Sequence, residues 1–395
     1  MIISFMFLCI VFDVRVISVS SWHRCQSKNI FDLSTDYRGV SWSIGGENTL
    51  ETVTTLPNIL KKFNPSLKGF SRGQGLLQKG FNMAKSGAKT LDISAQVQAL
   101  IKALRENKEV NFENDWKLLT IFVGRNDICN YCIDQNNLSP QNYSHNLMLG
   151  LDILYKEVPR LLVNVVGIMQ IDPLKTVKKN TLACSLLQRN SCPCVINPSE
   201  NSPELEEIKR INREYQAEIQ YLISGDRYDG KEDFTVVLQP FLTNFFIPHI
   251  GKGEADPSFF SVDCFHLSVK AHAEMATALW NNMLEPLGRK QAHNNFTYDR
   301  SRIRCPSESN PFIFTKINSL PSLPSITTTT AAPGTSTTSS SSAHQCPSSM
   351  PVWVPVIVGM ASLLAGITVA SLILFWCQCW KSKAMRETEM KRTVF

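Results

Sequence analysis

The 395-residue sequence lacks the charge pattern of a nucleic-acid-binding protein. Charged residues make up only 19% of the chain, and its net charge of +6 comes partly from cations near the C-terminus. It has no stripe of basic and aromatic residues, which a nucleic-acid surface requires. No internal repeat is visible either. We therefore expect no nucleic-acid partner, and the 43% of hydrophobic residues is typical of a globular protein with an additional apolar segment.

One long run, residues 352–376, contains no charged residue and reads VWVPVIVGMASLLAGITVASLILFW. At 1.5 Å per helical residue it can cross a hydrocarbon layer about 30 Å thick. The basic tail that follows, residues 377–395, favours the cytoplasmic side. The sequence therefore predicts a transmembrane helix at 352–376, a cytoplasmic tail, and a single-pass type I protein of the cell membrane whose ectodomain is extracellular.

A shorter apolar run, MIISFMFLCIVF, begins the chain. It is too short to span a membrane but has the length of a signal-peptide core. No Lys or Arg precedes it, and the residues around Ser18 to Ser21 only loosely match a cleavage site. Residues 1–21 are therefore predicted to be a signal peptide or, alternatively, an N-terminus foreign to the domain that follows.

Residues 319–350 are rich in Ser, Thr and Pro, with SITTTTAAPGTSTTSSSS at the centre. Such a segment is too polar to pack, and in a secreted chain it predicts an O-glycosylated stalk. The sequons at Asn142 (N-Y-S) and Asn295 (N-F-T) predict N-linked glycans on surface loops.

The cysteines before the stalk are consistent with an oxidising compartment. The close spacing of Cys129 and Cys132, and of Cys184, Cys192 and Cys194, suggests local disulfides. The pairing stays open. The C-x-x-C could instead suggest zinc or redox chemistry. It has no second C-x-x-C or His pair at zinc-finger spacing, so we expect no metal site.

The C-terminal tail carries two short motifs. Cys377 and Cys379 follow the predicted span directly, where they could be palmitoylated or remain idle thiols. The chain ends in Arg392-Thr393-Val394-Phe395, with a Thr two positions before a hydrophobic C-terminus, which is typical of PDZ-domain ligands. A PDZ protein is therefore a candidate partner.

Between these segments, residues 29–305 alternate strand-like with helix-like patterns. Short β-branched runs predict strands at 118–123, 161–166 and 234–240. Helical patterns lie at 94–105, 144–157, 203–222 and 268–284. This alternation predicts an α/β sandwich with a central parallel sheet covered on both faces. Ligands of such sheets bind at the carboxyl ends of the strands.

Three motifs could carry chemistry at that edge. Asn126, in a G-R-N-D sequence directly after a predicted strand, could donate its amide to a developing oxyanion, or simply end the strand in a turn. Asp263 and His266 lie three residues apart, so the carboxylate could orient the imidazole as a general base, or the histidine could be a surface loop residue. Gly87 could bring a backbone N–H close to a ligand.

In this order the motifs N-x-x-x-x-G, G-x-N-D and D-x-x-H resemble those of the GDSL or SGNH hydrolase family. The segments that carry the resemblance most closely are YRGVSWSIGGE, TTLPNILKKFNP, NDWKLLTIFVGRNDICNYC, DCFHLSVKAHAEMATALWNNMLEPLGRK and NNFT. They look like the membrane-associated phospholipase B subgroup, specifically its C-terminal catalytic repeat with the membrane anchor.

The resemblance implies an SGNH-type three-layer sandwich over nearly all of residues 29–305. It implies that Gly87 and Asn126 form the oxyanion hole, that His266 is the base and that Asp263 orients it. The implied substrates are phospholipids, lysophospholipids and related lipid esters, cleaved through an acyl-serine intermediate without metal or cofactor. An apical membrane would follow from the family as well.

The sequence departs from the family in one respect, because no Gly-Asp-Ser occurs before Tyr37. The family nucleophile is therefore missing, and we expect the first strand of the sheet and one oxyanion donor to be missing with it. Ser20 and Ser21, at the end of the alternating segment 14–21, could stand in for it, whereas Ser41 and Ser43 have no family claim.

Two function classes follow from these observations. As a family member, the chain is a membrane-anchored phospholipase B-like ester hydrolase, of the phospholipase A and lysophospholipase type. As written, it could instead be an N-terminally truncated or alternatively started product, a silent ectodomain that binds lipid or a protein partner.

Overall fold

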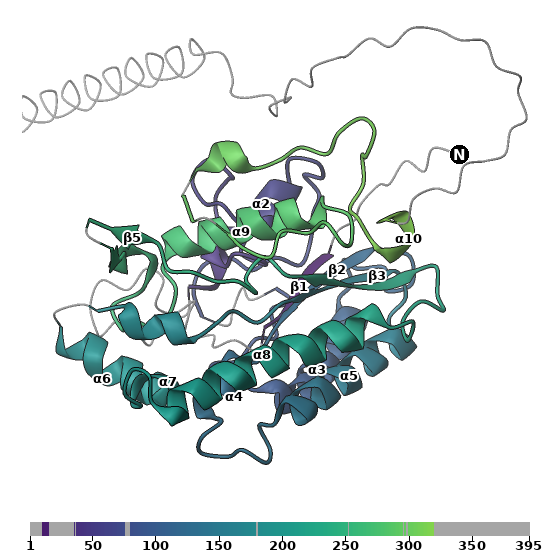
Figure 1. Cartoon of the computed structure of the whole chain (residues 1–395). Helices are drawn as coiled ribbons and strands as arrows, with labels where there is room; N and C mark the ends of the chain where they lie inside the picture. The colour runs from purple at the N-terminus through teal and green to yellow at the C-terminus, as the bar shows by residue number, and fades with distance from the viewer. Residues whose placement is uncertain are drawn as a thin grey trace, which may run out of the picture. The chain divides into compact units, whose positions relative to one another are not determined.

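The computed structural model describes residues 10–15, 35, 37–75, 80–178, 181–251, 253–294, 296–297 and 299–319. The chain divides into two compact units, Met1–Ser336 and Thr337–Phe395, and the second lies wholly outside the described residues. In the first unit a sheet lies between two groups of helices (Figure 1).

The central sheet consists of parallel strands β2 (Lys117–Phe122), β3 (Leu161–Val166) and β4 (Phe234–Gln239). Leu119 pairs with Val163, and Val163 pairs with Val236. All six residues of β2 are buried, which explains its continuous apolar sequence, since helices cover both faces of such a sheet. The predicted strands and their parallel arrangement are thus confirmed.

A further strand, β1 (Ile10–Arg15), pairs in parallel with β2, so the strand order is β1-β2-β3-β4. The expectation that the first strand would be missing is therefore wrong. β1 begins inside the run that resembles a signal-peptide core, and it lies earlier than the alternating segment 14–21, with which it shares only Val14 and Arg15. The rest of that segment, with Ser20 and Ser21, is outside the described residues.

Five helices account for most of the two outer layers. Helices α3 (Ile93–Glu106), α5 (Pro140–Glu157) and α8 (Pro203–Ser224) pack together on one face of the sheet. Helices α2 (Leu56–Leu60) and α9 (Val269–Met283) pack together on the other (Figure 1). The four predicted helices, at 94–105, 144–157, 203–222 and 268–284, are confirmed, and the fold is consistent with the SGNH type.

Serine caps begin three of these helices at the positions that the sequence allows. The hydroxyls of Ser139, Ser202 and Ser268 accept hydrogen bonds from backbone N–H groups three residues further on. In α5 and α8 a proline follows the cap, where its missing N–H costs no hydrogen bond. These caps fix where each helix leaves its loop.

The smaller elements surround the carboxyl ends of the strands or follow the last long helix. They are the helices α4 (Arg125–Asn130), α6 (Leu182–Ser191), α7 (Pro193–Ile196) and α10 (Lys316–Ser319), the strands β5 (His249–Ile250) and β6 (Glu254–Ala255), and short 3-10 turns. Strands β5 and β6 form an antiparallel hairpin. None of these elements was predicted, and most of them are too short to show a periodic pattern.

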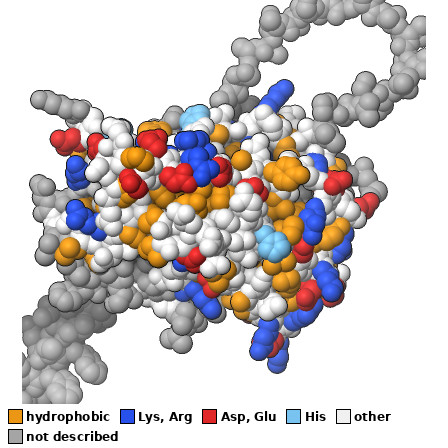
Figure 2. Space-filling model, turned by 60° about the horizontal axis from the view of Figure 1, so that its bottom comes forward, with side chains coloured by type: hydrophobic (Ala, Val, Ile, Leu, Met, Phe, Trp, Pro, Cys, Tyr) orange, Lys and Arg blue, Asp and Glu red, His pale blue; other side chains and the backbone are white. Residues whose placement is uncertain are grey.

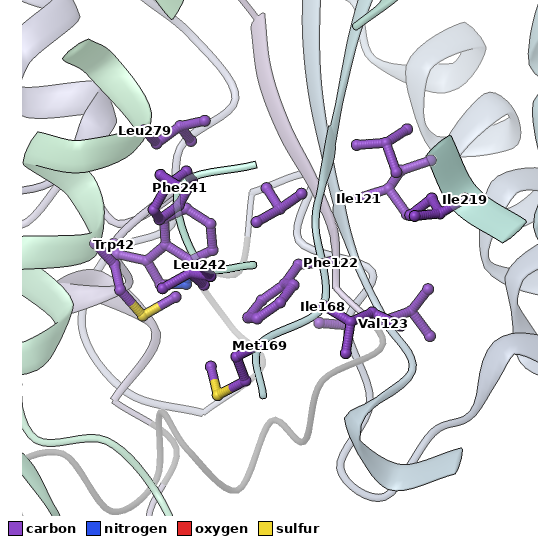
Figure 3. Packing of buried hydrophobic residues seen from close by; sticks show 14 of the residues in the cluster. Trp42, Ile121, Phe122, Val123, Ile168, Met169, Ile219, Phe241, Leu242 and Leu279 are labelled. Atoms are coloured by element: carbon purple, nitrogen blue, oxygen red, sulfur yellow. The ribbon is translucent and has the colours of Figure 1, made fainter. Parts of the chain in front are cut away.

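Two hydrophobic layers sandwich the sheet (Figure 3). Ile121 of β2 points toward Ile219 of α8, whereas its neighbour Phe122 points to the opposite side, where Trp42 and Phe241 lie. The Trp42 ring meets Phe122 edge-on at 5.8 Å between centroids and Phe241 at 6.1 Å. The alternation of β2 side chains therefore serves both layers, as expected for a strand buried on both faces.

The outer surface mixes charges of both signs. Figure 2 shows acidic and basic side chains beside exposed hydrophobic ones on one face of the domain. On α8, Lys209 pairs with Glu206 and Arg210 with Glu207. Pairs of this kind at the surface contribute little to stability but keep the exposed face of a helix soluble.

Among the described residues, no helix is both long and apolar enough to cross a membrane. The predicted span at 352–376 and tail at 377–395 lie outside the described residues. So does the predicted stalk at 319–350, except for its first residue, which ends α10.

The sheet core should be sensitive to the loss of one buried side chain. Ile121 is fully buried, so Ile121→Ala removes its contacts and leaves a cavity, and we expect the free energy of unfolding to fall by about 3 kcal/mol. Ile133 is 69% exposed, and the matched variant Ile133→Ala should change it by less than about 0.5 kcal/mol. Urea unfolding followed by circular dichroism measures both, and equal effects would contradict the assigned core.

Candidate active site

Asp263 and His266 lie together in a loop that ends at helix α9. The His266 Nδ1 and the Asp263 Oδ2 are 2.5 Å apart, and both side chains are buried. Asp263 Oδ1 also accepts hydrogen bonds from the backbone N–H groups of Phe265 and His266. The carboxylate therefore holds both the imidazole ring and the backbone that carries it.

The loop at residues 261–266, called the His266 loop below, is tied at several points. Its two ends meet, because the Ser261 N–H donates to the His266 carbonyl at 2.7 Å. Cys264 has a positive φ of 54° and forms a disulfide with Cys184 of α6. The Gln188 side chain, also on α6, donates to the Cys264 carbonyl at 3.0 Å. Helix α6 is thus joined to the His266 loop by one disulfide and one hydrogen bond.

The disulfides differ from the local pairs suggested by spacing. Cys129 pairs with Cys192, Cys132 with Cys194, and Cys184 with Cys264, at sequence separations of 63, 62 and 80 residues. The expectation of local disulfides is therefore wrong. Because both cysteines of the C-x-x-C are oxidised to distant partners, that motif is neither a zinc ligand pair nor a redox dithiol.

The segment Gly124–Asp127 leaves the carboxyl end of β2 and opens α4. Gly124 has a φ of 115°, and a Cβ there would lie 2.5 Å from the Cδ1 of Ile168, so only glycine fits this turn. The turn directs Asn126 away from the strand, and its side-chain amide donates to the Ala88 carbonyl at 2.8 Å. Asn126 is only 6% exposed.

Gly87 lies next to that contact. It has a φ of 73°, which a residue with a Cβ rarely adopts, and its own position is exposed. Three residues further on, Thr90 donates to the Asp127 carboxylate through both its N–H and its hydroxyl. The segment at Gly87–Thr90 and the segment at Gly124–Asp127 are therefore joined at Asn126 and at its neighbour Asp127.

Arg125 connects the same segment to the His266 loop. Its Nη2 donates to the Phe265 carbonyl at 2.7 Å, and its guanidinium lies 3.9 Å from the centre of the Phe265 ring. Burial lowers the pKa of Arg125 to about 10, a fall that the nearby Asp263 carboxylate opposes. Arg125 thus stays charged at neutral pH and stabilises the loop by a charge-assisted hydrogen bond.

These contacts bring three of the predicted motifs into one place, although they are far apart in the sequence. Asn126 reaches the residue after Gly87, and Arg125 reaches the residue before His266. The arrangement contains a buried Asp–His pair, a side-chain amide and a glycine with a positive φ, which are groups that can serve base-assisted acyl transfer. Arg125, Gln188 and the Cys184–Cys264 disulfide were not predicted, because a supporting contact has no sequence signal.

The structure describes one of the two predicted glycosylation sites. Asn142 is exposed, but it lies in the first turn of α5 rather than in a loop, and its amide nitrogen donates to the Asn136 carbonyl. Asn295 is outside the described residues. Within the described part of the chain, no group of three His, Cys, Asp or Glu side chains could hold a metal ion.

Comparison with known proteins gives a consistent result. The family model of the GDSL-like lipase/acylhydrolases matches residues 35–279. The chain is 47% identical over 287 residues to the rat protein "Phospholipase B1, membrane-associated", covering 73% of this chain and 20% of that protein. The mouse protein of that name is 46% identical over 297 residues, with 74% and 20% covered, and the human protein 43% over 312, with 78% and 21%.

The chain therefore spans about a fifth of the length of these curated relatives. No solved structure matches it.

The link through Arg125 predicts how the His266 loop responds to substitution. Arg125→Lys keeps the charge but loses the planar fork that reaches the Phe265 carbonyl and covers its ring. A lost charge-assisted hydrogen bond costs about 1.5–3 kcal/mol, so the Phe265 and His266 amides should exchange with deuterium at least about tenfold faster, as read by mass spectrometry.

Arg227→Lys is the matched control, because Arg227 makes a two-pronged bond to Asp152 at the surface. It should leave exchange in the His266 loop unchanged. Equal exchange in the Arg125→Lys and unmodified proteins would show that Arg125 does not hold the loop.

Asp127 predicts a pH dependence of stability. Burial raises its pKa from 3.8 to about 6, so the folded protein retains a proton that the unfolded chain releases at lower pH. The stabilisation by protonated Asp127 is therefore fully present below about pH 4 and is lost as the pH rises through about 6. Asp127→Asn mimics the protonated group. The difference in unfolding free energy between this variant and the unmodified protein should therefore grow by about 3 kcal/mol, in favour of the variant, as the pH rises from 4 to 7.

Urea unfolding at each pH measures this difference. The Thr90 hydroxyl lowers the pKa of Asp127 by donating to it, so Thr90→Val should move the same change to higher pH. A difference between Asp127→Asn and the unmodified protein that stays constant with pH would contradict the assignment.

Proposed function

Because the chain belongs to the GDSL-like lipase/acylhydrolase family, we propose that it is a phospholipase B-like hydrolase of lipid esters, built as the C-terminal catalytic repeat of a larger membrane-anchored enzyme. The observation that carries the proposal is the buried Asp263–His266 pair, with 2.5 Å between carboxylate and imidazole, tied through Arg125 to Asn126. Phospholipids and lysophospholipids are the proposed substrates.

In the proposed reaction, His266 takes the proton of a serine hydroxyl while the serine oxygen attacks the ester carbonyl. The tetrahedral intermediate collapses, the alcohol leaves with the proton from His266, and the acyl group remains on the serine. Water then attacks the acyl-serine, again with His266 as base, and releases the fatty acid. Asp263 keeps the imidazole in the orientation for both steps and stabilises the imidazolium.

Asn126 and Gly87 are the proposed oxyanion donors. An amide group carries two hydrogens, and Asn126 uses one for the Ala88 carbonyl, so the other can be donated to the substrate oxygen. The positive φ of Gly87 turns the backbone in a way that can present its N–H to the same oxygen. Each such donor accounts for roughly a hundredfold to a thousandfold in rate in comparable enzymes.

The proposed reaction requires a serine, and no Gly-Asp-Ser precedes Tyr37. Strand β1 ends at Arg15, and Ser18, Ser20 and Ser21 are the first serines after it in the sequence. The missing block favours a second candidate function, a catalytically silent ectodomain that binds lipid or a protein partner. Both candidates use the same Asp–His loop and differ only in the nucleophile.

The surroundings of the domain are proposed from the sequence. They comprise a single-pass type I topology with a span at 352–376, an extracellular ectodomain, an O-glycosylated stalk, and N-glycans on Asn142 and Asn295. Residues 1–21 are either a signal peptide, whose cleavage would remove β1, or an N-terminus that stays in the domain and keeps β1 in the sheet. The membrane-associated relatives support an attachment to the membrane. An apical location and a PDZ partner at Arg392–Phe395 belong to the same proposal.

A fluorophosphonate probe, which labels only activated serines, tests the proposal on intact cells that express the full chain. Labelling of the chain as written, lost in His266→Ala, would mean that a serine near β1 acts as the nucleophile. Replacing Ser18, Ser20 and Ser21 singly by Ala would then identify it.

A minimal repair separates the two candidates. The double substitution Val16→Gly and Ile17→Asp completes Gly-Asp-Ser with Ser18 directly after β1. Labelling of this variant alone would mean a competent site in a silenced chain. If neither form is labelled, although both reach the cell surface, the proposed hydrolase function is wrong.

A further inference from the structure

Three successive carbonyls of the His266 loop each accept a hydrogen bond. Those of residues 264–266 accept from the Gln188 amide at 3.0 Å, the Arg125 guanidinium at 2.7 Å and the Ser261 N–H at 2.7 Å, in that order. The Ser261 bond lies within the loop, and Arg125 belongs to α4. Gln188 belongs to α6, so it connects the loop to a third part of the chain.

The peptide unit between Cys264 and Phe265 is held at both of its ends. Its carbonyl accepts from Gln188, and its N–H, on Phe265, donates to the Asp263 Oδ1 at 3.2 Å. Cys264 has a φ of 54°, a backbone conformation that a residue with a Cβ adopts only where its surroundings hold it there. If this peptide unit turned, the bonds to Gln188 and to Asp263 would both break.

Asp263 carries the effect of that peptide unit to the imidazole. Its Oδ1 accepts from the backbone, and its Oδ2 lies 2.5 Å from the His266 Nδ1. Since both oxygens belong to one planar carboxylate, turning the Phe265 N–H away would let the carboxylate rotate and weaken its contact with the ring. The disulfide at Cys264 does not by itself fix the plane of the peptide that follows. Gln188 supplies that constraint.

The Gln188 side chain also contacts the segment that follows β3. Its Nε2 lies 3.0 Å from the Leu174 carbonyl and 3.2 Å from the Val177 carbonyl, in and just after the 3-10 turn Asp172–Thr176. The side chain is buried, and an amide nitrogen carries two hydrogens, so three carbonyls share two donors away from water. Replacing Gln188 by an apolar residue would remove this donor from all three carbonyls, which is costly at a buried position.

That segment is fixed by contacts of its own. Leu174 and Val177 are buried, and the Ile171 N–H, just before the turn, donates to the Asn212 Oδ1 of α8 at 3.0 Å. A buried amide held against such a support can orient a third carbonyl without being displaced itself. The amide therefore links a fixed part of the domain to the His266 loop.

We propose that Gln188 is a positioning residue of the proposed hydrolase: by donating to the Cys264 carbonyl, it keeps Asp263 in the orientation that holds the His266 imidazole. The inference rests on the proposed function, because it assigns Gln188 a part in setting the base of that reaction. Gln188 touches no substrate in this role and acts only through the loop. The role requires a side chain that donates, which an amide does and an ionised carboxylate does not.

Two substitutions test the donor. Gln188→Met keeps the length of the side chain and removes both hydrogens. Gln188→Glu keeps the shape, and its carboxyl can donate while it is protonated but is repelled by the three carbonyls once it ionises. Burial raises the pKa of such a carboxyl, so we expect the loop to be held in this variant at about pH 5 and released at about pH 8.

The proton between the His266 Nδ1 and the Asp263 Oδ2 gives the readout, because a proton in a short, charge-assisted hydrogen bond resonates far downfield in an NMR spectrum. It is recorded on the full chain purified in detergent micelles and assigned by its absence in His266→Ala. At each pH the unmodified chain is the reference. We expect this proton to exchange with water at least about fivefold faster in Gln188→Met. In Gln188→Glu the faster exchange should appear at about pH 8 and be absent at about pH 5.

Gln216 of α8 provides the matched control. Its Nε2 donates to the Ile168 carbonyl at 2.7 Å and to the Thr243 carbonyl at 2.9 Å, so it is the same kind of amide between two other segments. Gln216→Met and Gln216→Glu undergo the same pH change, including any titration of Asp127 and His266. They should leave the exchange of the downfield proton unchanged.

Two results would overturn the positioning role directly. One is equal exchange of the downfield proton in Gln188→Met and the unmodified chain, and the other is an equal effect of the substitutions at positions 188 and 216. Loss of that proton in both Gln188 variants at both pH values, together with loss of the native circular dichroism, would overturn it as well, since Gln188 would then serve folding alone.

This readout needs no nucleophile, so its failure and a failure of fluorophosphonate labelling are read separately. If the chain, or its form repaired by Val16→Gly and Ile17→Asp, is labelled, Gln188→Met should slow the labelling at least about fivefold, and Gln216→Met should not. Labelling with an unaffected downfield proton would keep the hydrolase and contradict the role of Gln188. A faster-exchanging proton in a chain that is never labelled would support that role and contradict the hydrolase.

Discussion

The hydrogen bonds made by Arg125 and Asn126 are the constraint on which the site depends. The two residues are neighbours in the sequence, yet Arg125 holds the Phe265 carbonyl and Asn126 holds the Ala88 carbonyl. One short turn at the end of β2 therefore positions segments that lie 38 residues before it and 140 residues after it. Gly124 makes this possible, because its φ of 115° redirects the chain directly from the strand.

Burying a guanidinium and two carboxylates in this region is costly, and the structure offsets the cost locally. The Arg125 guanidinium is stabilised by the Phe265 carbonyl, by the Phe265 ring and by the negative charge of Asp263. Asp263 accepts hydrogen bonds from the backbone N–H groups of Phe265 and His266, in addition to its contact with the His266 ring. Asp127 has the N–H and hydroxyl of Thr90, but burial still raises its pKa. Buried charges without such partners would be far more destabilising.

The disulfides cross-link the same segments covalently. Cys264 lies between Asp263 and His266, and its bond to Cys184 ties their loop to α6. Two further bonds link Cys129, in the α4 helix that carries Asn126, and Cys132, just after it, to Cys192 and Cys194 at α7. Both sides of the site are thus cross-linked to one small group of helices, which is consistent with a domain that works in an oxidising compartment.

The sequence by itself determined the family, the parallel sheet and the long helices, because hydrophobic periodicity and turn residues are local signals. It also identified Asp263, His266, Asn126 and Gly87 as candidates, since their motifs are short and contiguous. Tertiary structure alone decided the cysteine pairing, the role of Arg125 and the position of β1, because each depends on residues that are distant in sequence. Spacing suggested local disulfides, but which sulfurs can meet is fixed only when α4, α6 and the His266 loop have packed together.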